Sequence, residues 1–164
     1  MEIVDEAIAG GHKIIVFSQF VRMLKLIEER FKQASISYEY LDGSTRDRMS
    51  RVRRFNKDES VSVFLISLKA GGTGLNLTAA DMVVHVDPWW NPMVEKQATD
   101  RAHRIGQDKR VVTYKLITAG TIEEKMLKLQ QKKQSIFNAV IEENKNPVFN
   151  LTWEDIKELF EWED

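Results

Sequence analysis

Apolar and polar positions along the chain follow two periods, one typical of buried strands and one typical of amphipathic helices. Short apolar runs predict five strands: KIIVFS (13–18), ISYEYL (36–41), VSVFLISL (61–68), DMVVHVD (81–87) and VVTYKLI (111–117). A segment with helical spacing, QFVRMLKLIEERFKQ (19–33), follows the first strand. Because each strand is followed by a helix or a long loop, the pattern predicts an α/β fold, a mainly parallel sheet covered by helices on both faces.

Capping signals predict where the later helices begin, because a side-chain oxygen before the first turn accepts a hydrogen bond from an otherwise unpaired N–H group. The predicted helices are an arginine-rich one opened by Ser44 and Asp47, one over 92–105 opened by Asn91 and Pro92 and ended by Gly106, a long one from Thr121 and Glu124 to about Asn144, and a short closing one in TWEDIKELFEW.

The loops that follow the strands are the expected location of a site, since ligands of parallel α/β sheets bind at the carboxyl ends of the strands. These loops contain small polar residues, glycines and tryptophans. They are SQ (18–19), DGST (42–45), SLKAGGTGLN (67–76) and DPWWNP (87–92).

The composition predicts one compact globular domain, with 164 residues of which 43% are hydrophobic and 30% charged. The absence of cysteine excludes disulfides, thiolate metal sites and cysteine nucleophiles. No apolar run approaches the roughly 20 residues of a membrane span, and the acidic N-terminus does not fit a signal peptide. We therefore expect a soluble, intracellular chain.

The net charge of −1 is the sum of a basic part and an acidic C-terminal part of the chain. Residues 142–164 hold eight acidic and two basic residues, so residues 1–141 carry a charge of +5. Within that part, the segment STRDRMSRVRRFNK (44–57) has five arginines and a lysine against one aspartate. It is either a solvated helix face or a patch that tracks phosphates.

Two further loops have both a structural and a functional interpretation. The glycines of SLKAGGTGLN allow backbone N–H groups to approach an anion, but the spacing differs from that of a P-loop and also suits a tight turn. In DPWWNP, adjacent side chains point in different directions, so we expect either Trp89 or Trp90 to be exposed for contact.

The segment QATDRAHRIGQ (97–107) places Gln97, Arg101 and Arg104 on one face of the predicted helix. An ion pair with Asp100 at i, i+4 would explain Arg104 but not Arg101. Two arginines on one face also suit the oxygens of a transferring γ-phosphate, because each guanidinium is always charged and binds such oxygens in pairs. The chain has no HExxH, no GxSxG and no suggestive carboxylate pair, so hydrolase chemistry of its own has little support.

Four blocks together resemble the second RecA-like lobe of the SWI2/SNF2 (Snf2-type) ATPases of helicase superfamily 2. In order they are IIVFSQF, YLDGST, FLISLKAGGTGLNLTAADMVVHVDPWWNP and QATDRAHRIGQ, within roughly residues 10–130. The resemblance implies a RecA-like lobe over residues 1–120, with a brace helix and a closing helix of the same domain over 121–164. It also implies coupling of ATP hydrolysis to movement along double-stranded DNA.

The resemblance assigns roles by position. Arg101 and Arg104 match the arginine fingers, and Gln97 matches a nucleotide-sensing position that faces ATP held by another lobe. Gly74 and Asn76 match positions near the nucleotide. The positions that match the DNA-contacting surface are Ser18, Gln19, Asp42, Gly43, Ser44, Lys69, Gly71 and Gly72, and Trp90 resembles an aromatic that reaches the minor groove.

The chain lacks the Walker A lysine and the magnesium-binding acidic motif of the whole enzyme. We therefore expect ATP and Mg²⁺ to be bound mainly by an absent first lobe of the same polypeptide, and the chain alone to be inactive with no metal site. The other implied partners are double-stranded DNA and a DNA-bound protein target, without a membrane. The implied location is nucleoid-associated in a prokaryote or nuclear in a eukaryote.

Two alternatives stay open. HRIG (103–106) also begins the RNA-helicase motif HRIGRxGR, but Gln107 stands where that motif has arginine, which disfavours an RNA-helicase lobe. The second alternative is a non-catalytic α/β interaction module whose basic patch binds acidic proteins.

Overall fold

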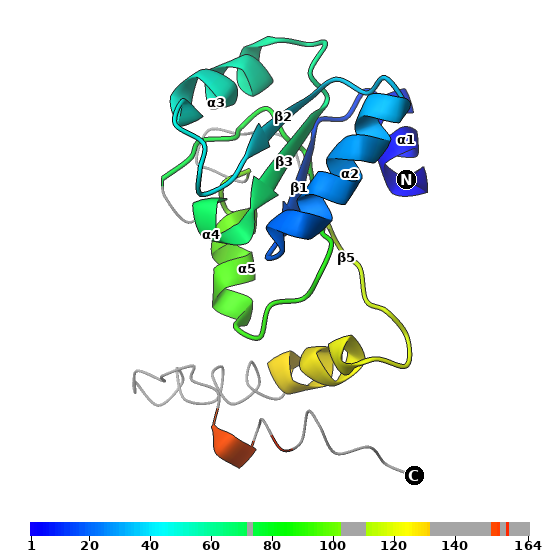
Figure 1. Cartoon of the computed structure of the whole chain (residues 1–164), viewed down its shortest axis with the longest axis vertical. Helices are drawn as coiled ribbons and strands as arrows, with labels where there is room; N and C mark the ends of the chain where they lie inside the picture. Colours follow the sequence, from blue (N-terminus) through cyan, green and yellow to red (C-terminus); the bar gives the residue numbers. More distant parts are fainter. Residues whose placement is uncertain (72–73, 103–110, 132–151, 155–156, 158–164) are drawn as a thin grey trace.

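The computed structural model describes residues 1–71, 74–102, 111–131, 152–154 and 157, and contains a five-stranded sheet in which every pair is parallel (Figure 1). The strand order is β2-β3-β1-β4-β5. The strands are β1 (Ile14–Ser18), β2 (Tyr38–Leu41), β3 (Val63–Ser67), β4 (Met82–His85) and β5 (Val112–Lys115). Each lies within one of the five apolar runs, so the α/β prediction is confirmed.

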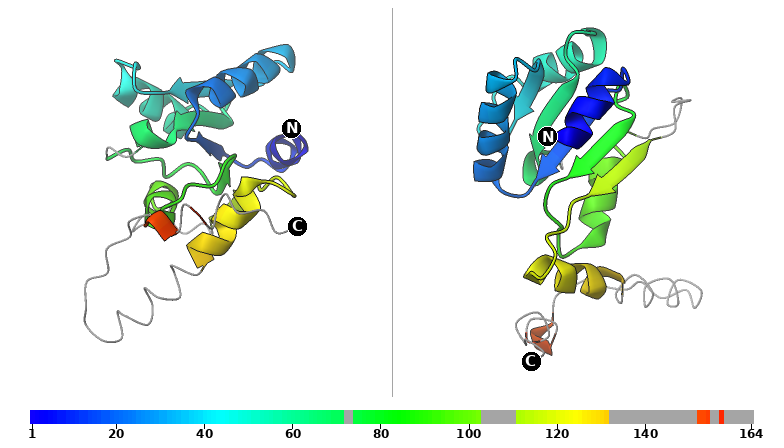
Figure 2. Two further views of the ribbon diagram at one scale, coloured as in Figure 1. Left: turned by 60° about the horizontal axis from the view of Figure 1, so that its bottom comes forward. Right: turned by 90° about the vertical axis from the view of Figure 1, so that its right-hand side faces the viewer.

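Helices cover both faces of this sheet (Figure 2). They are α1 (Glu2–Ala9), α2 (Val21–Gln33), α3 (Arg48–Lys57), the short α4 (Leu68–Gly71) and α5 (Pro92–Thr99), and residues 122–131 are also helical. Within the described residues, none of the helices is long and apolar enough to cross a membrane.

The core lies in two layers because successive side chains of a strand point to opposite faces. In β1, Ile14 and Val16 pack with α1 and α2, whereas Ile15 and Phe17 pack with α3 and α5. These four apolar side chains of β1 are at most 2% exposed. Burial on both faces explains the continuous apolar run in the sequence.

Two helix boundaries differ from the sequence prediction. Asp47, not Ser44, is the N-cap of α3, and its carboxylate accepts a hydrogen bond from the Ser50 N–H at 3.3 Å. The helix that begins after Asn91 ends at Thr99 rather than at residue 105. Its predicted start is confirmed, because the Asn91 side chain accepts from the Met93 N–H.

Other predicted helix ends lie outside the described residues. These are Gly106, the part of the long helix from 132 to 144 and most of the closing helix. The division at residue 120 stays a prediction.

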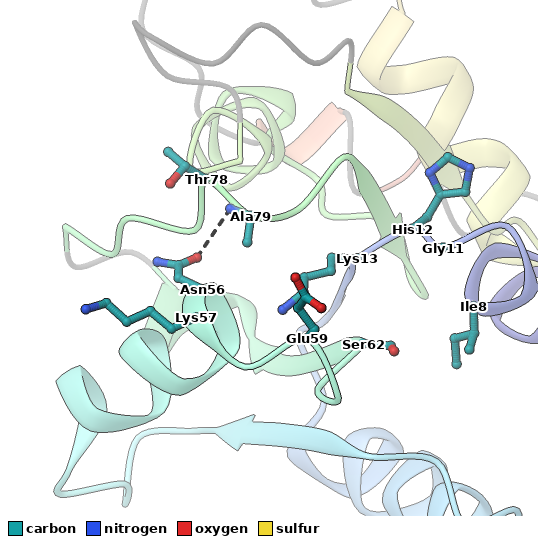
Figure 3. A pocket seen from close by; sticks show the side chains of 10 residues that line it. All are labelled: Ile8, Gly11, His12, Lys13, Asn56, Lys57, Glu59, Ser62, Thr78 and Ala79. Atoms are coloured by element: carbon teal, nitrogen blue, oxygen red, sulfur yellow. Dashed lines mark hydrogen bonds between the residues drawn. The ribbon is translucent and has the colours of Figure 1, made fainter.

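A cavity of about 590 Å³ lies at the amino ends of the strands, away from the loops predicted to form the site (Figure 3). Lys13 lines it, but its ammonium group donates to the carbonyl oxygens of Phe55 at 2.6 Å and Asp58 at 2.7 Å. The cation thus neutralises the carboxyl-terminal end of α3, where helix carbonyls lack partners. At this edge Lys13 therefore has a structural role.

Candidate functional site

The loop after β1 is joined to the loop after β4 by one buried carboxylate. The Ser18 hydroxyl donates to Asp87, whose other oxygen accepts from the Gln19 N–H at 2.9 Å. Gln19 also donates from its side chain to the Pro88 carbonyl at 3.2 Å. Ser18 is 1% exposed and Asp87 7%. Ser18 therefore holds two loops together and does not present its hydroxyl to a ligand, whereas Gln19 is half-buried and reaches the surface.

The loop after β2 is organised by Asp42. Its carboxylate accepts from the Ser44 N–H at 2.9 Å, from the Ser44 hydroxyl at 2.7 Å and from the Tyr40 hydroxyl at 3.1 Å. These hydrogen bonds, that of the Ser44 hydroxyl first, lower the pKa of Asp42 below its usual value. Asp42 is buried, and Gly43 and Ser44 are exposed. Asp42 thus shapes a loop that presents its neighbours.

The loop after β3 begins with the short helix α4 rather than with an extended turn. Lys69 is exposed, while Gly71 is buried against the ring of Phe17, where an added Cβ would lie 3.0 Å from that ring. Gly72 lies outside the described residues. Gly71 therefore allows close packing of α4 on β1, and of these residues Lys69 is the one that can touch a ligand.

Gly74 and Asn76, the predicted nucleotide neighbours, are both exposed. Gly74 has a φ of +52°, a conformation that favours glycine. The Asn76 carbonyl accepts from the Asn56 side chain at 2.8 Å, which ties this segment to α3. The Asn76 side chain remains at the surface.

Gln97 and Arg101, two members of the predicted row, do not share a helix, because α5 ends at Thr99. Gln97 is exposed near the end of α5, but Arg101 follows the helix in a turn and is 7% exposed. The Arg101 carbonyl accepts from the Leu77 N–H at 3.1 Å, which fixes this turn against the segment after the glycine loop. Arg104 lies outside the described residues.

The tryptophan pair differs from the prediction that one ring is exposed. Trp89 and Trp90 are both half-buried, with ring centroids 6.2 Å apart and planes tilted by 37°. Trp89 packs against the core cluster beneath α3 and α5. Trp90 therefore offers part of a ring at the carboxyl edge.

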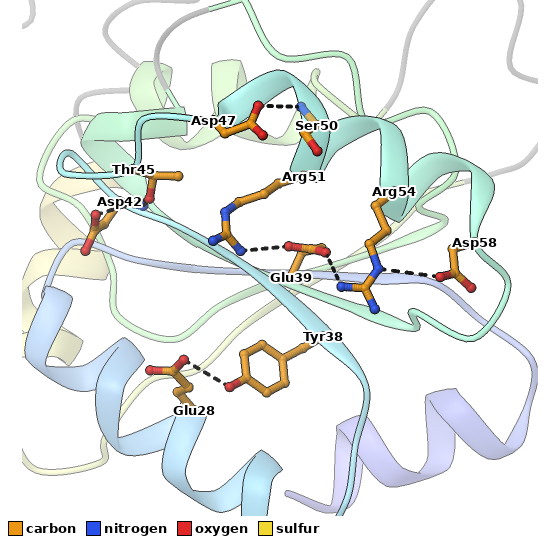
Figure 4. A network of polar contacts seen from close by, with 10 residues as sticks. All are labelled: Glu28, Tyr38, Glu39, Asp42, Thr45, Asp47, Ser50, Arg51, Arg54 and Asp58. Carbon is orange, nitrogen blue, oxygen red and sulfur yellow. Dashed lines mark hydrogen bonds and ion pairs between the residues drawn. The ribbon is translucent and has the colours of Figure 1, made fainter.

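Part of the positive charge of the arginine-rich helix α3 has a structural role. Arg51 and Arg54 each donate to Glu39 at 2.9 Å, and Glu39 is 3% exposed on the edge strand β2 (Figure 4). Arg54 also pairs with Asp58 at 3.5 Å. A buried carboxylate requires compensating charge, so these two arginines are used within the fold. Arg53 and Lys57 of this helix are also exposed, and neither of them pairs with Glu39.

Several residues that organise the site were missed by the sequence reasoning. Asp87, Glu95 and His85 are buried polar residues at the carboxyl edge, and Gln130 reaches the same region from the helix over 122–131. Asp87, directly after a strand and before a proline, was the one detectable from the sequence. The others form contacts between distant segments. Among the described residues, no group of three or more His, Asp or Glu side chains could hold a metal ion.

A parallel five-stranded sheet with these loops at its carboxyl edge defines a RecA-like helicase lobe. The family model for the helicase conserved C-terminal domain matches residues 1–106, and the chain belongs to this family. It is homologous to the C-terminal lobe of Snf2-type ATPases, as the relatives and the related structure indicate.

An uncharacterized ATP-dependent helicase of Mycoplasma pneumoniae is 45% identical over 163 residues, which cover 98% of this chain and 16% of that protein. The chromatin-remodeling ATPase INO80 of Aspergillus oryzae is 45% identical over 142 residues, 85% of this chain and 10% of that protein. The crystal structure of the C-terminal part of the Fun30 ATPase domain has a TM-score of 0.73 and 34% identity, covering 91% of this chain and 43% of that one. The chain thus corresponds to a small part of its longer relatives.

Proposed function

We propose that the chain is the second motor lobe of an ATP-dependent translocase and remodeller that moves along double-stranded DNA. One observation carries the proposal: the loops assigned to the DNA backbone and the α5 segment assigned to ATP meet at the same edge of one sheet. The Leu77 N–H donates to the Arg101 carbonyl, which links the two segments assigned to ATP. Ser18 and Gln19 donate to Asp87, which links two loops assigned to DNA, and the second of these loops runs directly into α5.

The DNA-facing role falls to the side chains at the surface. Gly43, Ser44 and Lys69 are exposed and would contact phosphates, with Gln19 and Trp90 beside them. Buried Ser18, Asp42 and Gly71 would position these loops without touching DNA. Contacts to phosphates alone do not read sequence, so we expect binding that is general and strongly salt-dependent.

The nucleotide-facing role falls to Gln97, Arg101, Arg104, Gly74 and Asn76. The described residues offer an amide and a guanidinium, which suit phosphate oxygens, but no acidic cluster that suits Mg²⁺. ATP and Mg²⁺ would therefore be held mainly by the first lobe of the same polypeptide. Because Arg101 is 7% exposed, its guanidinium would become available as the lobes close and the turn after α5 rearranges.

Affinity for duplex DNA tests the DNA-facing surface. Replacing Lys69 by alanine in the full-length protein should weaken binding to all duplexes alike and reduce the salt slope by about one phosphate contact. Trp90→Ala should weaken binding about five- to tenfold, the cost of losing one aromatic contact of roughly 1 kcal/mol or more. Fluorescence anisotropy at several salt concentrations measures both effects. Lys57→Ala is the matched control, because Lys57 is an exposed cation that lines the cavity at the opposite edge.

The same titrations separate the alternatives. DNA affinity that is unchanged in both variants would favour the non-catalytic interaction module. Tighter binding to single-stranded RNA than to duplex DNA would favour the RNA-helicase lobe. We further propose that the motor acts on a protein bound to DNA. We expect it at the nucleoid in a prokaryote or in the nucleus in a eukaryote.

A further inference from the structure

Both backbone polar groups of Trp89 are held by buried side chains from other elements. Its N–H donates to Glu95 of α5 at 2.5 Å, and its carbonyl accepts from the side-chain amide of Gln130. Gln130 belongs to the helix over 122–131, 41 residues further along the chain. The conformation of the tryptophan loop is therefore fixed by side chains from two helices.

The same groups bond to one another. The Gln130 amide nitrogen also donates to Glu95 at 3.2 Å, and the second Glu95 oxygen pairs with Lys115 of β5. Glu95 is 1% exposed and Gln130 3%. A buried carboxylate with three partners from three segments is costly to disturb singly, so the tryptophan loop, α5, β5 and the 122–131 helix should move together.

This hydrogen-bond network lies at the carboxyl edge of the sheet rather than within the apolar core. Figure 1 and Figure 2 show the 122–131 helix beyond the carboxyl ends of the strands, next to α5. Within this helix, Leu129 and Gln130 are buried while Ile122 remains 38% exposed. Gln130 is therefore where the helix is anchored to the lobe by polar contacts, and the anchored group is the backbone next to Trp90.

We propose that Gln130, acting through Glu95 and the Trp89 backbone, is a positioning residue that couples Trp90 to α5 and the 122–131 helix during DNA-stimulated ATP turnover. The inference rests on the proposed function, since it assumes that Trp90 contacts DNA and that α5 leads to the nucleotide-facing Arg101. Gln130 itself touches neither ligand. Its loss should uncouple DNA binding from turnover.

The test uses Gln130→Met in the full-length protein, which keeps the length of the side chain and removes both donors. Gln131→Met is the matched control, because Gln131 is the next residue of the same helix and is exposed. We expect Gln130→Met to lower the stimulation of ATP turnover by duplex DNA about tenfold, within the range found for coupled contacts, and to leave DNA-free turnover close to that of the control at a temperature where both variants are folded.

A second measurement reports on the loop directly. In a Trp153→Phe, Trp162→Phe background, the remaining tryptophans are Trp89 and Trp90. Gln130→Met should shift their fluorescence emission to longer wavelength while the far-UV circular dichroism stays unchanged. This readout in the 164-residue chain does not depend on ATP turnover.

The outcomes distinguish a failure of the proposed function from a failure of the coupling through Gln130. A wild-type protein without DNA-stimulated turnover would overturn the proposed function, and the coupling with it. Stimulation in the wild type together with equal stimulation in Gln130→Met and Gln131→Met would overturn the coupling alone. A Gln130→Met protein that loses DNA-free and DNA-stimulated turnover by the same factor would also overturn it, because Gln130 would then be purely structural.

Discussion

Arg101→Ala in the full-length protein is expected to reduce DNA-stimulated ATP turnover by about 10³- to 10⁵-fold, the range for arginine fingers in phosphoryl transfer. A guanidinium stabilises the charge that develops on the transferring phosphoryl group, and alanine leaves that charge uncompensated. ATP binding should change much less, because in the proposed enzyme the first lobe holds the nucleotide. Steady-state phosphate release with saturating duplex DNA measures the effect.

Two variants separate this role from a contribution to folding. Arg101 is 7% exposed, so alanine also removes buried contacts. Arg101→Lys keeps the charge but not the planar fork, and should remain strongly impaired. Arg22→Ala, which removes an exposed arginine of α2, should behave like the wild type. Turnover of Arg101→Ala within tenfold of the wild type would remove Arg101 from the catalytic site.

The stability of the chain is expected to fall between pH 6.5 and pH 4 because of His85. Its side chain is 1% exposed, stacks on Phe17 and contacts the Thr99 hydroxyl at 3.1 Å. Burial, against an opposing effect of Glu95, lowers its pKa from 6.5 to about 4. The unfolded chain therefore binds the proton first, so stability is full above pH 6.5 and falls as the pH drops. The total loss is about 3 kcal/mol by pH 4.

Urea unfolding at a series of pH values checks this prediction. His85→Gln lacks the titrating group and retains a side chain that can contact Thr99, so its stability should vary little over the same range. The same slope in His85→Gln and in the wild type would show that another group is responsible.

The strands were predictable from the sequence because their signal is local. All five runs contain a strand. Burial on both faces explains the continuous apolar runs of β1 and β3, whereas β5 is exposed along its length. The strand order was not predictable in the same way, because it depends on contacts between distant segments. The helix after Asn91 was predicted with the correct start, since the cap and the proline act on adjacent residues.

Two errors show where tertiary contacts override local signals. Ser44 could not cap α3, because its N–H and hydroxyl both donate to Asp42. The chain leaves the α5 helix after Thr99, where the Arg101 carbonyl accepts from Leu77 and Ala102 is fully buried. A helical face drawn through Gln97 and Arg101 could not anticipate either contact.

The candidate site stays a prediction, but the structure decides which of its predicted side chains reach the surface. Lys69 lies at the surface at the carboxyl edge, as a phosphate contact requires, whereas Ser18 and Asp42 are buried. Arg51 and Arg54 of the basic helix balance Glu39, a partner that no local pattern identifies. Polar residues at strand ends thus predict where a site would lie, and burial separates the side chains that can reach a ligand from those that cannot.

The most direct test of the motor assignment is triplex displacement by the full-length protein. A translocase that follows duplex DNA should remove a third strand from a triplex when ATP is present and leave the duplex strands paired, and the Arg101→Ala variant should remove no third strand. ATP-dependent separation of an RNA duplex without triplex displacement, or hydrolysis of ATP that moves along no nucleic acid, would contradict the account.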